Sequence, residues 1–189
     1  MAMCSSALRK FLGPRGLLPK ESLIAAVPVS LRAEGDGGMN NQVSMVRVDL
    51  ATDTEDPVER FKAIHASSEA GKAVVRELKP VLGVDRPVAG MPWIVSGLAS
   101  LYGRSELARQ LPAMASVTIS NVPGPAAPLY VCGARMENFY PVSIPYHGSA
   151  LNITVHSYAG SLLEFGLIAC RRILSQEESY ELTGYLMDA

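Results

Sequence analysis

The residues that could carry acid–base or nucleophilic chemistry in this sequence are few and scattered. They are three histidines and three cysteines: His65, His147, His156, Cys4, Cys132 and Cys170. None stands in a motif that places a base beside a nucleophile or a metal, such as GxSxG or HExxH. No local feature of the sequence lowers the pKa of a thiol. The sequence therefore predicts no catalytic residue and no metal site in this chain.

Each histidine has a structural interpretation. His65 follows Ile64 on a predicted helix and suits a partly exposed helix position. His147 lies in a turn before a strand, where it is interpreted as solvated, with ligand contact as the alternative. His156 is central in the strand "NITVHSY", which favours packing or a cross-strand hydrogen bond. A catalytic pair of one cysteine and one histidine remains an alternative, because residues far apart in the sequence can meet in the fold.

A more specific pattern is the stretch "SNVPGPAAPLY", residues 120–130. Ser120 and Asn121 are polar residues at the end of a predicted buried strand, 115–119. Two prolines then fix the backbone, and Gly124 permits either close approach or a positive φ. The pattern predicts a stiff loop that could form the wall or floor of a site. The alternative is a turn that only terminates the strand.

Composition limits the class of protein. The chain has 189 residues, 48% hydrophobic content and a formal net charge of −1, with 17 basic and 18 acidic residues interspersed. This composition is typical of one globular domain or two small lobes. The balanced charges create no positive electrostatic potential that would attract nucleic acid. Three widely spaced cysteines argue against a disulfide framework or a zinc site and favour a cytoplasmic setting. The start of the chain does not resemble a signal peptide.

The elements that must position these residues follow from periodicity and turn signals. We predict helices at Ala2–Leu12, from Asp56 to before Pro80, at 91–111 as one or two helices, and after the capping box Ser175–Glu178. Strands are predicted at Ser22–Leu31, with Pro28 marking an edge or bulge, at Gln42–Leu50, and repeatedly after Ala115, with a hairpin turning at 159–161. Strands interleaved with long helices, followed by a run of further strands, imply an α/β protein with a mixed β-sheet covered by helices on at least one face. The stretch 91–103 is too short to cross a bilayer as a helix but could lie on a membrane surface.

Several linked motifs together carry a family resemblance. "SNVPGP…PLY", "GAR…YPVS" and "GSALNITVHSYAGSLLEFGL" closely resemble the C-terminal region of the bacterial wax ester synthase/acyl-CoA:diacylglycerol acyltransferase family. Upstream, "LIAAVPVSLR", the stretch 41–44 and "DPVERF" resemble the same family in the same order. The resemblance covers nearly the whole chain.

This resemblance implies one lobe of a fold similar to chloramphenicol acetyltransferase and nonribosomal-peptide condensation domains, in which two lobes enclose a tunnel. Members esterify diacylglycerol or a long-chain alcohol with acyl-CoA, so acyl-CoA is expected as a substrate and no cofactor is expected. Their general base is the second histidine of His-His-x-x-x-Asp-Gly in the earlier lobe. This sequence lacks that motif, and the family's Asn-Asp pair ahead of the first helix, so we expect residues 1–189 to be the C-terminal lobe without the N-terminal catalytic lobe. Cys170 and Ser175 also depart from the family pattern.

The resemblance further suggests which residues line the tunnel for substrate and CoA. They are the polar or glycine residues of the family-like motifs: Asn41, Ser120, Asn121, Gly124, Tyr140, Ser143, Asn152 and Thr154. For each of them, a buried hydrogen bond that holds the sheet together is an equally good interpretation.

Two hypotheses follow. In the first, the chain is the C-terminal lobe of an O-acyltransferase, inactive by itself, whose partner is a separate N-terminal lobe or another copy of the chain. In the second, it is a non-catalytic lipid- or partner-binding module, with 91–111 as its contact. Both allow peripheral contact with a membrane or a lipid droplet.

Overall fold

The computed structural model describes residues 1–32, 42–82, 96–97, 100, 114–144 and 149–189. Its centre is a five-stranded sheet in the order β2-β1-β3-β6-β7, in which β3 runs parallel to β1 and β6 and the other pairs are antiparallel. The sheet strands are β1 (Ile24–Ser30), β2 (Val43–Asp49), β3 (Val117–Val122), β6 (Leu151–Tyr158) and β7 (Leu162–Ala169). The helices are α1 (Ala2–Leu12), α2 (Pro57–Leu82) and α5 (Gln176–Met187), and a small hairpin consists of β4 (Tyr130–Val131) and β5 (Ala134–Arg135). The predicted α/β class with a mixed, helix-covered sheet is confirmed.

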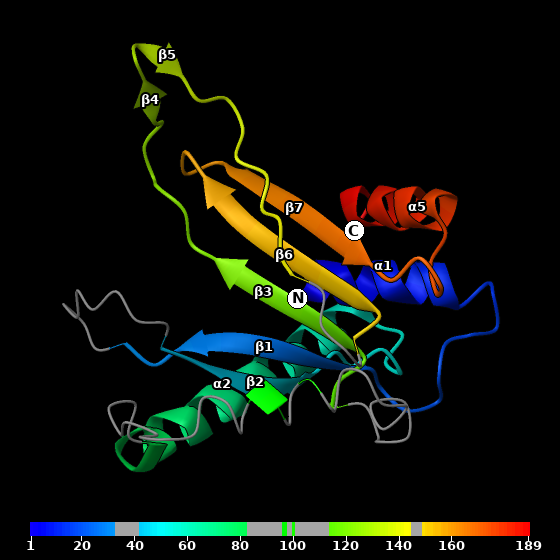
Figure 1. Ribbon diagram of the computed structural model, residues 1–189. Coiled ribbons are helices and arrows are strands. Elements are labelled where there is room, and N and C mark those ends of the chain that lie inside the picture. Colours follow the sequence, from blue (N-terminus) through cyan, green and yellow to red (C-terminus); the bar gives the residue numbers. More distant parts are fainter. Residues whose placement is uncertain (33–41, 83–95, 98–99, 101–113, 145–148) are drawn as a thin grey trace.

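Helices α1, α2 and α5 pack on one side of the sheet, which we call the helix-covered face (Figure 1). Register sets this face, because Val117 pairs beside Ala25 and Ile119 beside Ile153. The buried side chains fall into two clusters. Those under α1 and α5 include Cys4, Leu8, Phe11, Ala25, Val117, Ile119, Ile153, Leu182 and Leu186, and those under α2 include Val46, Val48, Ile64 and Val75.

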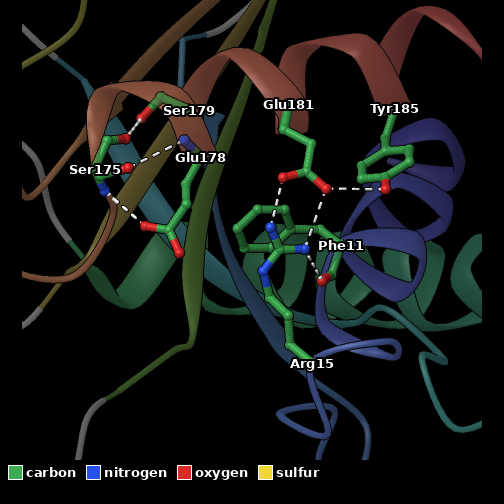
Figure 2. A network of polar contacts seen from close by, with 7 residues as sticks. All are labelled: Phe11, Arg15, Ser175, Glu178, Ser179, Glu181 and Tyr185. Carbon is green, nitrogen blue, oxygen red and sulfur yellow. Dashed lines mark hydrogen bonds and ion pairs between the residues drawn. The ribbon is translucent and has the colours of Figure 1, made fainter.

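Two helices begin where the sequence predicts. Asp56 accepts hydrogen bonds from the backbone amides of Val58 and Glu59, at 2.9 and 2.8 Å, so it caps α2. The capping box of α5 is complete, because Ser175 and Glu178 each bind the other's backbone amide (Figure 2). Ser175, a departure from the family pattern, therefore has a clear local role.

Some predicted boundaries were wrong. Helix α2 continues past Pro80 to Leu82, because the φ of proline is itself helical and only one amide bond is lost near the helix end. Strand β3 extends to Val122, because it pairs with β6 from Thr118 to Val122, which lies beside His156. Pro123 ends it, since proline has no amide to donate. The helices predicted at 91–111 lie outside the described residues except for 96–97 and 100.

Pro28 lies in β1, which has a strand on each side, but around Pro28 the described residues pair β1 with β2 alone. Pairing of β1 with β3 covers Ala25 and Ala26 among the described residues, and β3 has diverged where Pro28 stands. Strand β2 alternates, with Val46 and Val48 buried and Met45 about half exposed on the other side.

Residues 123–144, which we call the arm, connect β3 to β6 along the face opposite the helices. The arm carries the β4–β5 hairpin beyond the end of β6 and then returns over the sheet (Figure 1). Its two-residue turn has positive φ at Cys132 (49°) and Gly133 (81°), as a tight hairpin requires. On its return the arm contacts β7, where a Cβ on Gly166 would overlap the carbonyl oxygen of Pro141.

Candidate functional site

The face opposite the helices, which we call the polar face, holds three of the predicted site residues. Strand register places Ser120 beside Thr154 and Thr118 beside Asn152, so all four lie on this face. Thr118, Asn152 and Thr154 are buried. The structure thus brings Ser120, Asn152 and Thr154 together, as the prediction of a shared site requires.

These polar groups hold the arm against the sheet. The side-chain amide of Asn152 donates to the Ser143 hydroxyl at 2.9 Å. The backbone amide of Gly124 donates to the Ser157 hydroxyl at 3.0 Å, and a Cβ on Gly124 would lie 2.7 Å from Nδ1 of His156. For Gly124, Ser143 and Asn152, these hydrogen bonds therefore match the interpretation that the residues hold the arm and the sheet together. Of the two reasons suggested for Gly124, close approach is confirmed, and its φ is not among the positive values.

Two further residues that the sequence did not single out complete this attachment. The carboxylate of Glu164 accepts from the Phe139 amide at 2.6 Å, and Glu164 is only 7% exposed. The Tyr158 hydroxyl accepts from the Leu129 amide at 3.0 Å and donates to the Met136 carbonyl at 2.6 Å. A lone carboxylate inside the apolar run "SLLEFGL" is the signal that could have identified Glu164, because buried charges need fixed partners.

His156 packs as the sequence predicts. Its ring meets Phe139 edge to face, with 4.5 Å between ring centroids. Nδ1 lies 2.9 Å from the Ser157 carbonyl oxygen, and because that oxygen only accepts, Nδ1 carries the proton. His65 is exposed on α2 and stacks on Phe61, whereas His147 lies outside the described residues.

Two of the remaining predicted site residues, Asn121 and Tyr140, are not part of this buried polar group. Asn121 is one residue past Ser120 and so points to the helix-covered face. Tyr140 is 68% exposed. Asn41 lies outside the described residues. The described residues therefore do not form a single site that contains all eight predicted residues.

Asn121 instead lines an apolar cavity of about 220 Å³, which we call the end pocket. The cavity lies beside the start of α1, near the carboxyl ends of the parallel strands β1, β3 and β6, where open α/β sheets commonly bind ligands. Its lining is Met1, Met3, Cys4, Val27, Ile119, Asn121, Val155, Leu163 and Phe165. Sequence reasoning missed the apolar members because it considered only polar and glycine residues.

The chemistry of the end pocket is that of a binding surface. Burial raises the pKa of the Cys4 thiol above its ordinary value, so this thiol stays protonated and is a poor nucleophile. Among the described residues of the lining, Asn121 is the one with a polar side chain that strongly donates or accepts hydrogen bonds. The other two cysteines are free and exposed. The cavity is suited to an apolar chain rather than to proton transfer.

Within the described residues, no group of histidines, cysteines and carboxylates is arranged to hold a metal ion. In the same part of the chain, no helix is both long and apolar enough to cross a lipid bilayer.

The fold defines the class of protein to which the chain belongs. The chain aligns over 99% of its length with the starter condensation domain of rhizomide synthetase, at 13% identity and a TM-score of 0.50. This similarity concerns the fold only. The chain also aligns over 99% of its length with the wax ester synthase/diacylglycerol acyltransferase of Marinobacter aquaeolei, at 34% identity and a TM-score of 0.66. The chain therefore has the fold of one lobe of a chloramphenicol-acetyltransferase-like protein.

Sequence comparison identifies the family. Residues 39–187 match the model of the WS/DGAT C-terminal domain. A putative diacylglycerol O-acyltransferase of Mycobacterium tuberculosis is 42% identical over 172 residues, which is 91% of this chain. The O-acyltransferase WSD of Acinetobacter baylyi is 37% identical over 179 residues, or 95% of this chain. The chain belongs to the wax ester synthase/diacylglycerol acyltransferase family and matches its C-terminal domain.

The chain spans only part of these relatives. The matched region is 37% of the length of both the mycobacterial and the Acinetobacter protein, and 41% of the Marinobacter chain.

Proposed function

We propose that this chain acts as the C-terminal lobe of an O-acyltransferase and that the end pocket forms part of the wall of its acyl channel. The substrates would be a fatty acyl-CoA and either diacylglycerol or a long-chain alcohol. The observation that carries the proposal is the end pocket, a mostly apolar cavity beside the start of α1. The family resemblance expects the Asn-Asp pair just ahead of that helix, which would be close to this cavity.

The proposed reaction needs a base from outside residues 1–189. In it, a histidine of the N-terminal lobe takes the proton of the acceptor hydroxyl, and the oxygen attacks the thioester carbonyl. The new C–O bond forms, the C–S bond breaks, and the thiolate of CoA receives the proton. His156 is held by Ser157 and Phe139 beneath the arm, and so it is not proposed as that base.

The first test is complementation. We expect this chain by itself to form no ester above background from acyl-CoA and diacylglycerol. Mixed with an N-terminal lobe of a relative that carries His-His-x-x-x-Asp-Gly, it should restore ester formation. Ester is best measured by chromatography, because the exposed thiols of Cys132 and Cys170 would react with a thiol reagent. Turnover by this chain with all three histidines replaced would contradict the proposal.

The second test concerns the end pocket itself. Leu163 lines the pocket and is 57% exposed, so Leu163→Trp should narrow it with little loss of stability. In the complemented enzyme we expect at least a tenfold loss of activity with long-chain acyl-CoA, and less with short chains. Leu162→Trp is the matched control, because Leu162 is the adjacent residue on the other face of β7. Equal effects of the two substitutions would show that the pocket has no role.

The alternative is a non-catalytic lipid- or partner-binding module. It is favoured by exposed apolar side chains along the arm, of which Val142 and Ile144 are 85% and 81% exposed. Lipid binding by this chain, together with no turnover in the complementation mixture, would support this second function.

A further inference from the structure

A second and larger cavity lies at the opposite end of β7 from the end pocket. We call it the α5 pocket, and its volume is about 530 Å³, within the range of small-molecule sites. Leu167 and Ala169 of β7, together with Leu182 of α5, contribute to an apolar floor. Arg171, Gln176 and Tyr180 contribute polar groups to its lining.

The cavity exists because α5 packs on α1 rather than on β7. The Arg15 guanidinium near the end of α1 binds the Glu181 carboxylate of α5 at 2.5 Å, and Tyr185 donates to the same carboxylate (Figure 2). Leu182 and Leu186 of α5 are buried in the cluster that α1 shares. The first turn of α5 is thereby held away from the last residues of β7, and Leu167 and Ala169 stay only partly covered.

Arg171 is the one charged residue among the described lining residues of this pocket. Its guanidinium makes no hydrogen bond or ion pair with the described part of the chain. The nearby carboxylate of Glu178 accepts from the Ser175 amide at 2.7 Å. The start of α5 is thus satisfied by the chain's own carboxylate, and Arg171 is left as an exposed cation without a described ion-pair partner, at the rim of a cavity whose lining is about half polar and half apolar.

From this arrangement we infer that the α5 pocket binds a long-chain amphiphile with an anionic head, such as a fatty carboxylate. The alkyl chain covers the partly exposed side chains of Leu167, Ala169 and Leu174, and the head group pairs with Arg171. A guanidinium binds a carboxylate through two parallel hydrogen bonds, which fixes the orientation of the ligand. This site goes beyond the proposed acyl transfer and does not depend on it.

The test is calorimetric titration of this chain with sodium laurate below its critical micelle concentration. We expect saturable binding that Arg171→Ala weakens about tenfold, the size expected for losing a charged hydrogen bond. Cys170→Asp should also weaken it, because a carboxylate next to Arg171 competes with the ligand for the guanidinium. Arg172→Ala is the matched control, since Arg172 is exposed, adjacent and outside the lining, and should leave the affinity unchanged.

Two further measurements separate this site from the end pocket. Dodecanol, with the same chain and a neutral head, should bind wild type and Arg171→Ala equally. Leu163→Trp, which narrows the end pocket, should leave the Arg171-dependent laurate binding unaltered. Equal effects of Arg171→Ala and Arg172→Ala, no effect of either, or no laurate binding would overturn the inference, and thermal unfolding of each variant excludes misfolding as the cause.

Discussion

At the scale of single residues, Gly124 shows how one missing Cβ fixes the path of the arm. The backbone at Gly124 lies so close to β6 that a Cβ would overlap the Ser157 carbonyl oxygen and crowd the His156 ring. The obstacle is mainly backbone, which has little freedom to move aside inside a paired strand. The glycine is therefore required by packing and not by its φ.

We accordingly predict that Gly124→Ala lowers the free energy of unfolding by about 2–3 kcal/mol, as overpacking against an immovable neighbour does. Denaturant unfolding followed by circular dichroism measures this. Gly184→Ala is the matched control, because nothing lies within 4 Å of its added Cβ, and it should stabilise α5 by about 0.5–1 kcal/mol. If Gly124→Ala unfolded like wild type and its arm resisted protease equally, the proposed close contact would be wrong.

At the scale of elements, α1 and α5 are joined by charge as well as by apolar packing. The hydrogen bond from Arg15, and then that from Tyr185, lower the pKa of Glu181 below its ordinary value (Figure 2). The Arg15 guanidinium also lies over the Phe11 ring, 4.0 Å from its centroid, and donates to the Phe11 carbonyl at 2.8 Å. The pair is exposed to solvent, so its effect is modest and screened by salt.

This pair predicts a specific pH dependence. The pKa of Glu181 is lower in the folded chain than in the unfolded one, so its contribution is complete above the unfolded value of about 4.3 and is lost as pH falls through the folded value. The difference in denaturation midpoint between wild type and Glu181→Gln should therefore be present at pH 6 and vanish in acid. The same comparison in an Arg15→Ala background should show little pH dependence. A difference that persists below pH 3, or that survives without Arg15, would contradict this assignment.

At the scale of the whole molecule, the arm presents an apolar surface away from the sheet. Tyr130 and Val131 in the hairpin are 63% and 67% exposed, and Val142 and Ile144 are exposed on the returning segment of the arm. A stable domain rarely exposes so many apolar side chains along one segment unless they contact a partner. Hydrogen bonds from the polar face, such as that from Asn152 to Ser143, hold the arm against the sheet. The outer surface of the arm stays exposed.

We predict that Val142→Ser combined with Ile144→Ser leaves the stability of this chain unchanged and lowers ester formation in the complementation assay at least tenfold, because burying these two apolar side chains against a partner would stabilise the contact. Val58→Ser combined with Phe61→Ser on α2, two other exposed apolar residues, is the control and should have little effect. If the control pair abolished ester formation, or the arm pair did not reduce it, the arm would not be part of the contact between the lobes.

Local signals in the sequence determined most of the elements. Capping residues placed the starts of α2 and α5, the turn at 159–161 joins β6 to β7, and the run "SNVPGP" ends a strand in a loop that needs Gly124. These features depend on interactions between residues a few positions apart, which is why they can be read from the order of the residues. The motifs that carry the family resemblance are of the same kind.

Only the tertiary structure decided which residues share a site. Ser120 and Asn121 are adjacent in sequence and similar in chemistry, yet the period-two alternation of β3 sends them to opposite faces of the sheet. The end pocket and the attachment of the arm both depend on pairing between segments far apart in the chain, such as Phe139 with Glu164. Which strand lies beside which, and in what register, is set by burial over the whole sheet, and no local pattern in the sequence contains that information.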